Sequence, residues 1–393
     1  LETVRMLSGV RTISANAFYG ASGLTEVEIP NTVTSIGASA FYGCSSLQEV
    51  VVPNSVTSIG QGAFQGCNSL VKMTLPFVGG SRSTSGSAEK TNSMTWDGGS
   101  KYLFGYIFGG ETYRCSSGSN SSTIVYTGSV PAGTTYQGAS SYGDAYKSGR
   151  LTRYRHYIEV YYIPSSLREI VITDATGISA NAFYNCTMLT SITLNEGITA
   201  IYDRAFYNCD GLTEMVIPES VTSVGTYAFA ESGNLAKVTL PGGLTAIADY
   251  TFQNCTSLAS LNGNGEVVVG ANVTSIGGQA FTNCSQITSF TMQGVVTRIG
   301  AQAFDGCLNL IRINSEVDGK IVLQEGLTSV GNYAFRNLGK ITEVVIPNSV
   351  TSIGTGAFQG CNSLIRMTLP FVSRSRTATA YDAVFGYIFG YTT

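Results

Sequence analysis

The hydrophobic positions of this chain follow one pattern that returns along most of its length. In the stretch 24–44, Val27 and Ile29 alternate with polar residues, which is the period of a half-buried β-strand. Pro30 follows, and a proline ends a strand because it cannot donate to the sheet. A second extended piece leads to Gly37, where the chain can turn sharply. The pattern therefore predicts two short strands in each repeat.

An Ala-Phe pair closes each repeat. Residues 39–42 predict a single helical or 3₁₀ turn, which is too short to form a free-standing helix. The phenylalanine is the most regular anchor of the pattern, and seven of the ten gaps between anchors are 23 residues. The anchors are Phe18, Phe41, Phe64, Phe183, Phe206, Phe229, Phe252, Phe281, Phe304, Phe335 and Phe358.

A fixed period of this length is typical of a leucine-rich solenoid. One coil buries too little to be stable, whereas stacked coils bury a continuous core. We therefore predict a repeat solenoid with short parallel β-strands, short 3₁₀ or helical turns and one β-rich insert. Counting strand starts predicts 13 coils. The residues that we expect to form the structural core include Phe41, Phe64, Phe206, Phe229, Cys44 and Cys67.

Eight of the nine cysteines lie three residues after an anchor phenylalanine. The same position holds Ala21, Ser232 and Leu338 in other repeats, so it behaves as a packing slot. Disulfides are the alternative, but equivalent side chains in a stack point the same way and do not face each other. Zinc is disfavoured because no C-x-x-C pair occurs. We predict buried free thiols.

The repeats are interrupted, which suggests four regions. We expect leucine-rich repeats over 1–76, a Gly/Ser/Tyr-rich insert over 77–165, repeats over 166–370, and the start of a second, truncated insert over 371–393. The segment 50–78 recurs almost unchanged at 344–372, and both copies run on into the phrase F-G-Y-I-F-G. The duplication, together with ends that show no polar cap, leads us to expect a fragment of a longer array.

The insert allows two interpretations. In the first, Phe104, Tyr106, Ile107 and Phe108 form a small core that fixes the insert to the solenoid. In the second, its aromatic residues form an exposed recognition patch, since Tyr with Ser and Gly is typical of adaptable binding surfaces. The candidate ligand-binding residues of that patch are Trp96, Tyr157, Tyr161 and Tyr162. On the solenoid, a nearly uncharged row of outward strand residues adds Thr193, Val216 and Thr239 as candidates.

The complete repeat phrase, L-x-x-V-x-I-P-x-S-V-T-S-I-G-x-x-A-F-x-x-C, resembles the BspA-like, or treponemal-type, leucine-rich repeats. The resemblance covers about three quarters of the chain. It implies a bacterial cell-surface protein that adheres to host or matrix proteins or to other bacteria. It also implies an extracellular location, and it brings no catalytic residues to carry over.

Composition and motifs narrow the function further. The net charge is −3 and charged residues make up 12% of the chain, so no basic footprint for nucleic acid is present. No apolar run is long enough to predict a membrane span. The only histidine, His156, lies among arginines and tyrosines with no nucleophile motif nearby. We predict no enzyme, no cofactor and no metal site.

Three hypotheses of function follow. The first is a non-enzymatic surface adhesin whose partner is a host or bacterial surface protein, a matrix protein or a glycan. The second is a structural spacer or filament subunit, which the duplicated segments favour and which implies self-association. The third is glycan binding through the aromatic insert, residues 77–165.

Overall fold

A computed structural model describes residues 1–82, 101, 103–114, 134–140, 157–263, 265–375, 377 and 385–390. Side chains are not described for 111–114, 134–140 and 157–160. The chain forms two compact units, residues 1–197 and 198–393, and each is described by itself. Both units are stacks of β-solenoid coils. The first strand of a coil is its front strand, and the strand after the proline position is its back strand.

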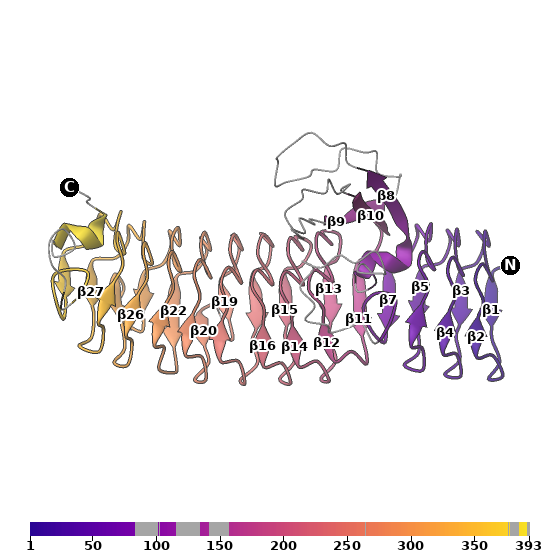
Figure 1. The fold of residues 1–393 in the computed structure, drawn as a ribbon, viewed down its shortest axis with the longest axis horizontal. Coiled ribbons are helices and arrows are strands. Elements are labelled where there is room, and N and C mark those ends of the chain that lie inside the picture. Colours follow the sequence, from indigo (N-terminus) through magenta and orange to yellow (C-terminus); the bar gives the residue numbers. More distant parts are fainter. Residues whose placement is uncertain are drawn as a thin grey trace, which may run out of the picture. The chain divides into compact units, whose positions relative to one another are not determined.

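Unit 1 contains six front strands, and its insert adds a separate sheet (Figure 1). The front strands are β1 (Thr3–Arg5), β3 (Glu26–Glu28), β5 (Glu49–Val51), β7 (Lys72–Leu75), β11 (Glu169–Ile172) and β13 (Ser191–Thr193). The back strands are β2 (Thr12–Ile13), β4 (Ser35–Ile36), β6 (Ser58–Ile59) and β12 (Gly177–Ile178). The insert contributes η1 (Phe104–Phe108), β8 (Gly110–Arg114), β9 (Thr134–Ser140) and β10 (Tyr157–Pro164).

The front sheet of unit 1 passes the insert without a break. Strands β7 and β11 pair directly and in parallel, with Lys72 opposite Glu169. The order of this sheet is β13-β11-β7-β5. The insert therefore leaves the coil and returns without displacing a front strand.

Unit 2 contains nine front strands in one parallel sheet. They are β15 (Glu214–Val216), β17 (Lys237–Thr239), β19 (Ser260–Leu261), β20 (Val267–Val269), β22 (Ser289–Met292), β24 (Arg312–Ile313), β25 (Lys320–Val322), β27 (Glu343–Val345) and β29 (Arg366–Thr368). The back strands are β14 (Ala200–Ile201), β16 (Ser223–Val224), β18 (Ala246–Ile247), β21 (Ser275–Ile276), β23 (Arg298–Ile299), β26 (Ser329–Val330) and β28 (Ser352–Ile353). A short 3₁₀ helix, η3 (Phe385–Phe389), follows.

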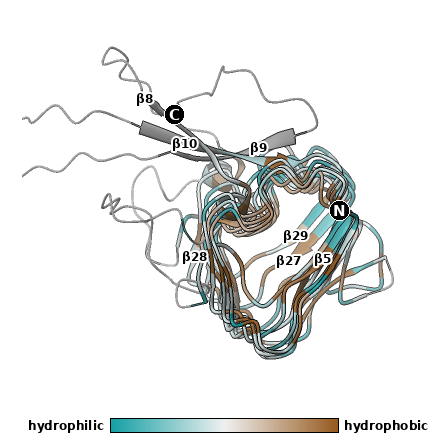
Figure 2. Ribbon diagram, turned by 90° about the vertical axis from the view of Figure 1, so that its right-hand side faces the viewer, coloured by the Kyte–Doolittle hydropathy of each residue, from teal (hydrophilic) through white to brown (hydrophobic). Residues whose placement is uncertain are grey.

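Each of the 13 predicted coil starts leads into a front strand, and two more strands, β20 and β25, are present that the count did not include. The predicted alternation holds in the front strands, where the middle residue is buried between two exposed ones. Figure 2 shows the paired front strands β27 and β29 of unit 2, coloured by hydropathy. The phenylalanines stack as predicted: the ring centroids of Phe18 and Phe41 are 5.2 Å apart, and those of Phe206 and Phe229 are 5.3 Å apart. The predicted core residues are all buried: Phe41, Phe64, Phe206, Phe229, Cys44 and Cys67.

The turn around the anchor phenylalanine is not the helical or 3₁₀ turn that we expected. Residues 38–43 form consecutive hydrogen-bonded turns. Ser39 and Gly43, two residues before and two after Phe41, have φ of 54° and 72°. Left-handed residues cannot continue a right-handed helix. Every anchor is bracketed in this way, which explains why Asn and Gly recur two residues after the phenylalanine.

The cysteine slot also has a polar role that the sequence did not reveal. The eight described cysteines are buried and free, as predicted. Six of them donate a hydrogen bond to the carbonyl oxygen of the anchor phenylalanine of the preceding coil, for example Cys255 to Phe229 at 3.1 Å. Ser232 donates the same bond to Phe206, also at 3.1 Å. The slot therefore favours a small side chain that can donate a hydrogen bond.

Candidate interaction surfaces

The interrupted coil of unit 1 uses part of the insert as solenoid. In regular coils, the N–H of the anchor phenylalanine donates to the next coil, as Phe41 does to Ala63 at 2.7 Å. At the interruption, Phe64 N–H donates to the Ile107 carbonyl at 2.9 Å, and Phe104 N–H donates to the Ala182 carbonyl at 2.9 Å. Helix η1 therefore occupies the place of an Ala-Phe turn between two ordinary coils.

Burial of η1 supports the same conclusion. Phe104, Ile107 and Phe108 are fully buried. The ring centroid of Phe104 lies 5.2 Å from that of Phe183. The first of the two interpretations of the F-G-Y-I-F-G phrase, a core that fixes the insert, agrees with these contacts.

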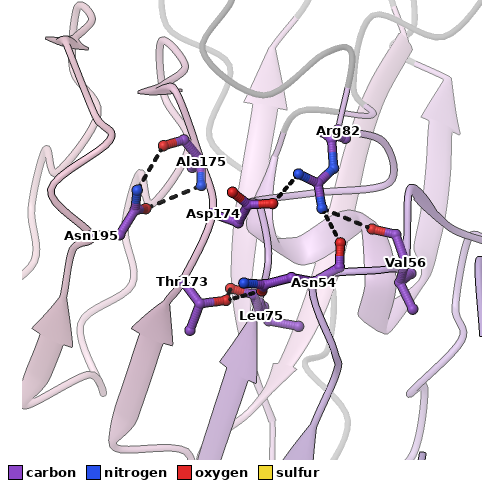
Figure 3. Close-up of polar contacts among 8 residues, drawn as sticks. All are labelled: Asn54, Val56, Leu75, Arg82, Thr173, Asp174, Ala175 and Asn195. Carbon is purple, nitrogen blue, oxygen red and sulfur yellow. Dashed lines mark hydrogen bonds and ion pairs between the residues drawn. The ribbon is translucent and has the colours of Figure 1, made fainter. Parts of the chain in front are cut away.

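A polar latch holds the chain where it enters the insert (Figure 3). The Arg82 guanidinium forms an ion pair with Asp174 and donates hydrogen bonds to the carbonyl oxygens of Asn54 and Val56. Thr173 donates its hydroxyl to the Asn54 side chain at 2.6 Å. These contacts tie together the coils before and after the insert. They fix the first stretch of the insert, 79–82, against the solenoid.

The second F-G-Y-I-F-G phrase docks in the same way in unit 2. Gly356 N–H donates to the Tyr387 carbonyl and Phe358 N–H to the Ile388 carbonyl, at 2.9 and 3.0 Å. The equivalent bonds at the first phrase run from Gly62 and Phe64, at 3.1 and 2.9 Å. The duplication that is visible in the sequence is therefore also a duplication of structure.

The aromatic candidates of the insert divide into two groups. Tyr161 and Tyr162 lie in β10 and are 2% and 7% exposed, so their side chains offer almost no surface to a ligand. They are buried because the end of β10 packs against η1, where Tyr162 N–H donates to Gly109. The prediction that they form an exposed patch is thus not supported. The backbone of Tyr157 is part of β10, as the alternation predicted, and Trp96 and His156 lie outside the described residues.

Strand β10 is the centre of a small antiparallel sheet with the order β8-β10-β9 (Figure 1). Ile158 lies opposite Tyr113 on one side and Ser140 on the other. The insert thus contains regular β-structure, and η1 and the end of β10 join it to unit 1.

The two expanded repeats of unit 2 follow a different plan. Their extra residues form β20 and β25, which enter the front sheet beside β19 and β24. The back sheet receives no extra strand at these places, because β18 pairs directly with β21 and β23 with β26. The expansions therefore change only the front face of unit 2.

Two asparagines make this insertion possible. In a regular coil, the Ile217 N–H donates to the Thr239 backbone carbonyl at 2.9 Å. At the first expansion, Leu240 N–H donates instead to Asn262 Oδ1 at 2.6 Å, and the Asn262 amide donates to the Val268 carbonyl. Asn314 makes the equivalent bonds with Met292 and Val322. Both residues have a positive φ, 54° and 47°, at which the chain turns out of the strand. Their side-chain amides then supply the hydrogen bonds that the backbone of the strand would otherwise make.

The loops of the two expansions are connected by one arginine. Arg312 Nη2 lies 3.0 Å from Glu266 Oε1, and its Nη1 lies 2.8 Å from Asp318 Oδ1. The hydrogen bond to Asp318 raises the pKa of the Arg312 guanidinium most, and the hydrogen bond to Glu266 raises it further. Val317, in the second loop, is 61% exposed. The loops are thus held in place while they present an apolar side chain to solvent.

The outward row of the front strands is accessible, as the sequence predicts. Val216 is 64% exposed, Thr193 is exposed and Thr239 is half-buried. Val216 and Thr239 lie opposite each other on β15 and β17. The structure brings together these two candidates in unit 2, and Thr193 occupies the equivalent row in unit 1.

Two further findings concern the part of the chain that the structure describes. In that part of the chain, no cluster of three or more His, Cys, Asp or Glu side chains could hold a metal ion. Within the same residues, no helix has both the length and the apolar character needed to cross a membrane.

Known structures with this architecture come from several bacteria. A leucine-rich repeat protein from Bacteroides ovatus is 20% identical, with a TM-score of 0.50, and the match covers 94% of this chain and 81% of that one. A leucine rich cell surface protein from Faecalibacterium prausnitzii is 22% identical (TM-score 0.37, 94% and 87% covered). The leucine-rich repeat protein of T. pallidum is also 22% identical (TM-score 0.30, 72% and 77% covered). The first of these likenesses supports the fold alone.

No curated protein matches the chain in sequence. Residues 1–86, 159–269, 264–322 and 314–383 match the family described as BspA type leucine rich repeat region, in 6 copies. These ranges cover far more than half of the chain and follow the coils of both units. The chain therefore belongs to the BspA-type leucine-rich repeat family.

Proposed function

We propose that this chain is a non-enzymatic, extracellular bacterial surface protein that holds a protein partner on its front face. The observation that carries the proposal is the accessible, uncharged Val and Thr row of the front strands, interrupted in unit 2 by two loops that Arg312 holds together. Apolar and hydroxyl side chains on a rigid sheet lose little entropy when a partner covers them. Fixed loops with an exposed valine can then supply local specificity.

Two sets of charge substitutions within the same coils test this proposal. Val216→Glu with Thr239→Glu changes the front row, whereas Thr222→Glu with Thr245→Glu changes exposed threonines on the back side. We expect the front variant to lose binding to a panel of purified extracellular-matrix proteins and whole bacterial cells, and the back variant to keep it. If no member binds the unaltered chain, or if both variants bind equally, the front face is not the site.

A structural spacer is the second candidate, because the docking of F-G-Y-I-F-G is repeated with the same hydrogen bonds in both units. A repeated module of this kind is suited to building length. Light scattering over a concentration series separates the two candidates. Ordered polymers favour the spacer, and a monomer that binds a partner favours the surface-binding function.

A further inference from the structure

A groove lined by both hydroxyl-bearing and apolar residues crosses the back strands of unit 1 and ends at the insert. The groove has a volume of about 450 Å³. Its floor comes from β2, β4 and β6, and its end wall is formed by Gly80, Ser81, Lys101 and Tyr106 of the interrupted coil. All of these residues belong to unit 1.

The floor of this groove is made of backbone and small side chains. A Cβ added to Gly37 would lie 2.3 Å from Ala15 N, and one added to Gly60 would lie 2.3 Å from Ala38 N. Glycine is therefore required for the coils to approach this closely. Ser35 and Ser58 provide hydroxyl groups on neighbouring strands, which are spaced by about 4.8 Å. A ligand in the groove would meet hydrogen-bonding groups at every coil.

The end wall combines an aromatic ring with a cation. A Cβ added to Gly80 would lie 2.3 Å from a Tyr106 ring carbon, so the ring is seated directly against this glycine. Lys101 is exposed beside it and forms no ion pair with any described residue. Among the described residues that line the groove, none is a carboxylate. The wall therefore attracts negative charge next to a fixed aromatic ring.

At the second docking phrase, no glycine occupies the position of Gly80, which makes room for the Tyr106 ring at the first. Arg374 holds the place of Gly80, since Ile353 N–H donates to the Arg374 carbonyl as Ile59 N–H donates to Gly80, both at 2.8 Å. A side chain at this place competes with the tyrosine ring for the same space. The groove is thus a property of the first docking site and does not follow from the repeat alone.

We propose that this groove binds an extended acidic oligosaccharide, with a sugar carboxylate at Lys101 and a sugar ring against Tyr106. Hydroxyl groups and backbone polar groups can pair with sugar hydroxyls along the floor. The strand spacing of about 4.8 Å is close to the length of one sugar residue in an extended chain, so successive residues can meet successive coils. The site is separate from the front face, so its test is independent of the protein-binding function.

Isothermal titration of the full chain with a trigalacturonate, and with a neutral trisaccharide of the same length, tests the proposal. We expect the acidic sugar to bind more tightly. Lys101→Gln should weaken its binding about tenfold, because a charge-assisted contact is lost, and should leave the weaker binding of the neutral sugar unchanged. Lys340→Gln, which removes an exposed lysine of unit 2 outside the groove, is the matched control and should have no effect.

Gly80→Arg copies the second docking site into the first and should abolish binding of both sugars, with circular dichroism reporting whether the coils remain folded. Because Lys101→Gln changes only an exposed side chain, the proposal stays testable even if Gly80→Arg fails to fold. Absence of binding by the unaltered chain would overturn the proposal, as would binding that survives Lys101→Gln undiminished. Equal binding of an acidic peptide such as hexaglutamate would assign the groove to a protein partner instead.

Discussion

The interrupted coil of unit 1 and the expanded coils of unit 2 both accommodate residues beyond the regular repeat, but they do so in different places. The interrupted coil keeps its front strands β7 and β11 paired, places η1 where an Ala-Phe turn would lie, and adds the separate sheet β8-β10-β9. The expanded coils keep their additional residues within the front sheet as β20 and β25. The comparison shows that a solenoid accepts an insertion where the backbone hydrogen bonds of the neighbouring coils can still be completed.

The largest expected effect concerns η1. If η1 is part of the solenoid, Phe104→Ala should destabilise unit 1 by about 3–5 kcal/mol, as much as Phe41→Ala in a regular coil, because both rings are fully buried. Urea unfolding followed by circular dichroism, together with hydrogen exchange of the flanking coils, measures the change.

The matched control is Phe385→Ala at the second docking phrase, where the ring is 46% exposed and the loss should be less than half as large. If Phe104→Ala lowers the free energy of unfolding no more than Phe385→Ala does, η1 lies on the solenoid without contributing to its stability.

The next effect is a loss of stability at high pH, caused by three buried thiols of unit 2. Burial raises the pKa of the Cys255, Cys284 and Cys307 thiols, which lie in consecutive coils of unit 2. A raised folded-state pKa means that the stability is fully present below the unfolded value near 9.0 and is lost as pH rises above it. We expect each thiol to cost about 1.4 kcal/mol for each pH unit above that value.

Unfolding of the full chain between pH 7 and pH 9.5 tests this expectation, with hydrogen exchange locating the loss in the coils that hold these thiols. The triple variant that replaces these three cysteines by serine should flatten the pH dependence, because serine does not titrate in this range. A decline that is as steep in the triple variant as in the unaltered chain would assign it to other groups.

A third effect concerns the asparagines of the expanded coils. Asn262→Gly and Asn314→Gly keep the positive φ but remove the amide that completes the sheet edge, so each should cost about 1–3 kcal/mol. Asn16→Gly is the control, since Asn16 has a φ of 60° and no side-chain hydrogen bond is found for it. We expect that variant to change the free energy of unfolding by only a few tenths of a kcal/mol. Equal losses at all three positions would show that the amides do not hold β20 and β25 in the sheet.

The sequence predicts the regular coils well because each of their features is repeated. The strand period, the anchor phenylalanine and the cysteine slot recur often enough that a single physical reason explains every copy. The left-handed residues around Phe41 were not predicted, although the recurrence of Asn and Gly two residues after the anchor was a usable signal.

The expanded coils could not be predicted in this way because their determinants are not repeated at a fixed spacing. Asn262 and Asn314 occur in loops of different length, and their role depends on hydrogen bonds to Leu240 and Met292 of the preceding coil. The groove beside the insert depends likewise on Gly80 and Tyr106, which are distant in sequence and meet only in the folded coil. The burial of Tyr161 and Tyr162 was missed because alternation predicts that β10 is a strand but does not predict that its end packs on η1.

A fourth effect concerns the thiol hydrogen bond, which regular coils of both units share. Cys255→Ala removes the bond to the Phe229 carbonyl and should cost about 1 kcal/mol, whereas Cys255→Ser should keep it, as Ser232 does in the preceding coil. Urea unfolding at pH 7, where the thiol is protonated, compares the two. A serine variant less stable than the alanine variant would mean that the slot is governed by apolar packing alone.

The smallest expected effect on stability concerns Arg312. Its substitution should change the exchange rates of two loops much more than the free energy of unfolding. Its two ion pairs are partly exposed, so Arg312→Gln should lower the free energy of unfolding by less than about 1 kcal/mol. The amides of the loops 262–266 and 314–319 should nevertheless exchange faster, because each loop loses its link to the other. Arg366→Gln, which removes a single longer ion pair to Glu343 with no loop attached, should leave loop exchange unchanged. Equal exchange in the two loops of both variants would show that Arg312 does not hold the loops. In that case, the backbone hydrogen bonds of the sheet and the asparagines would fix the expanded coils of unit 2 by themselves.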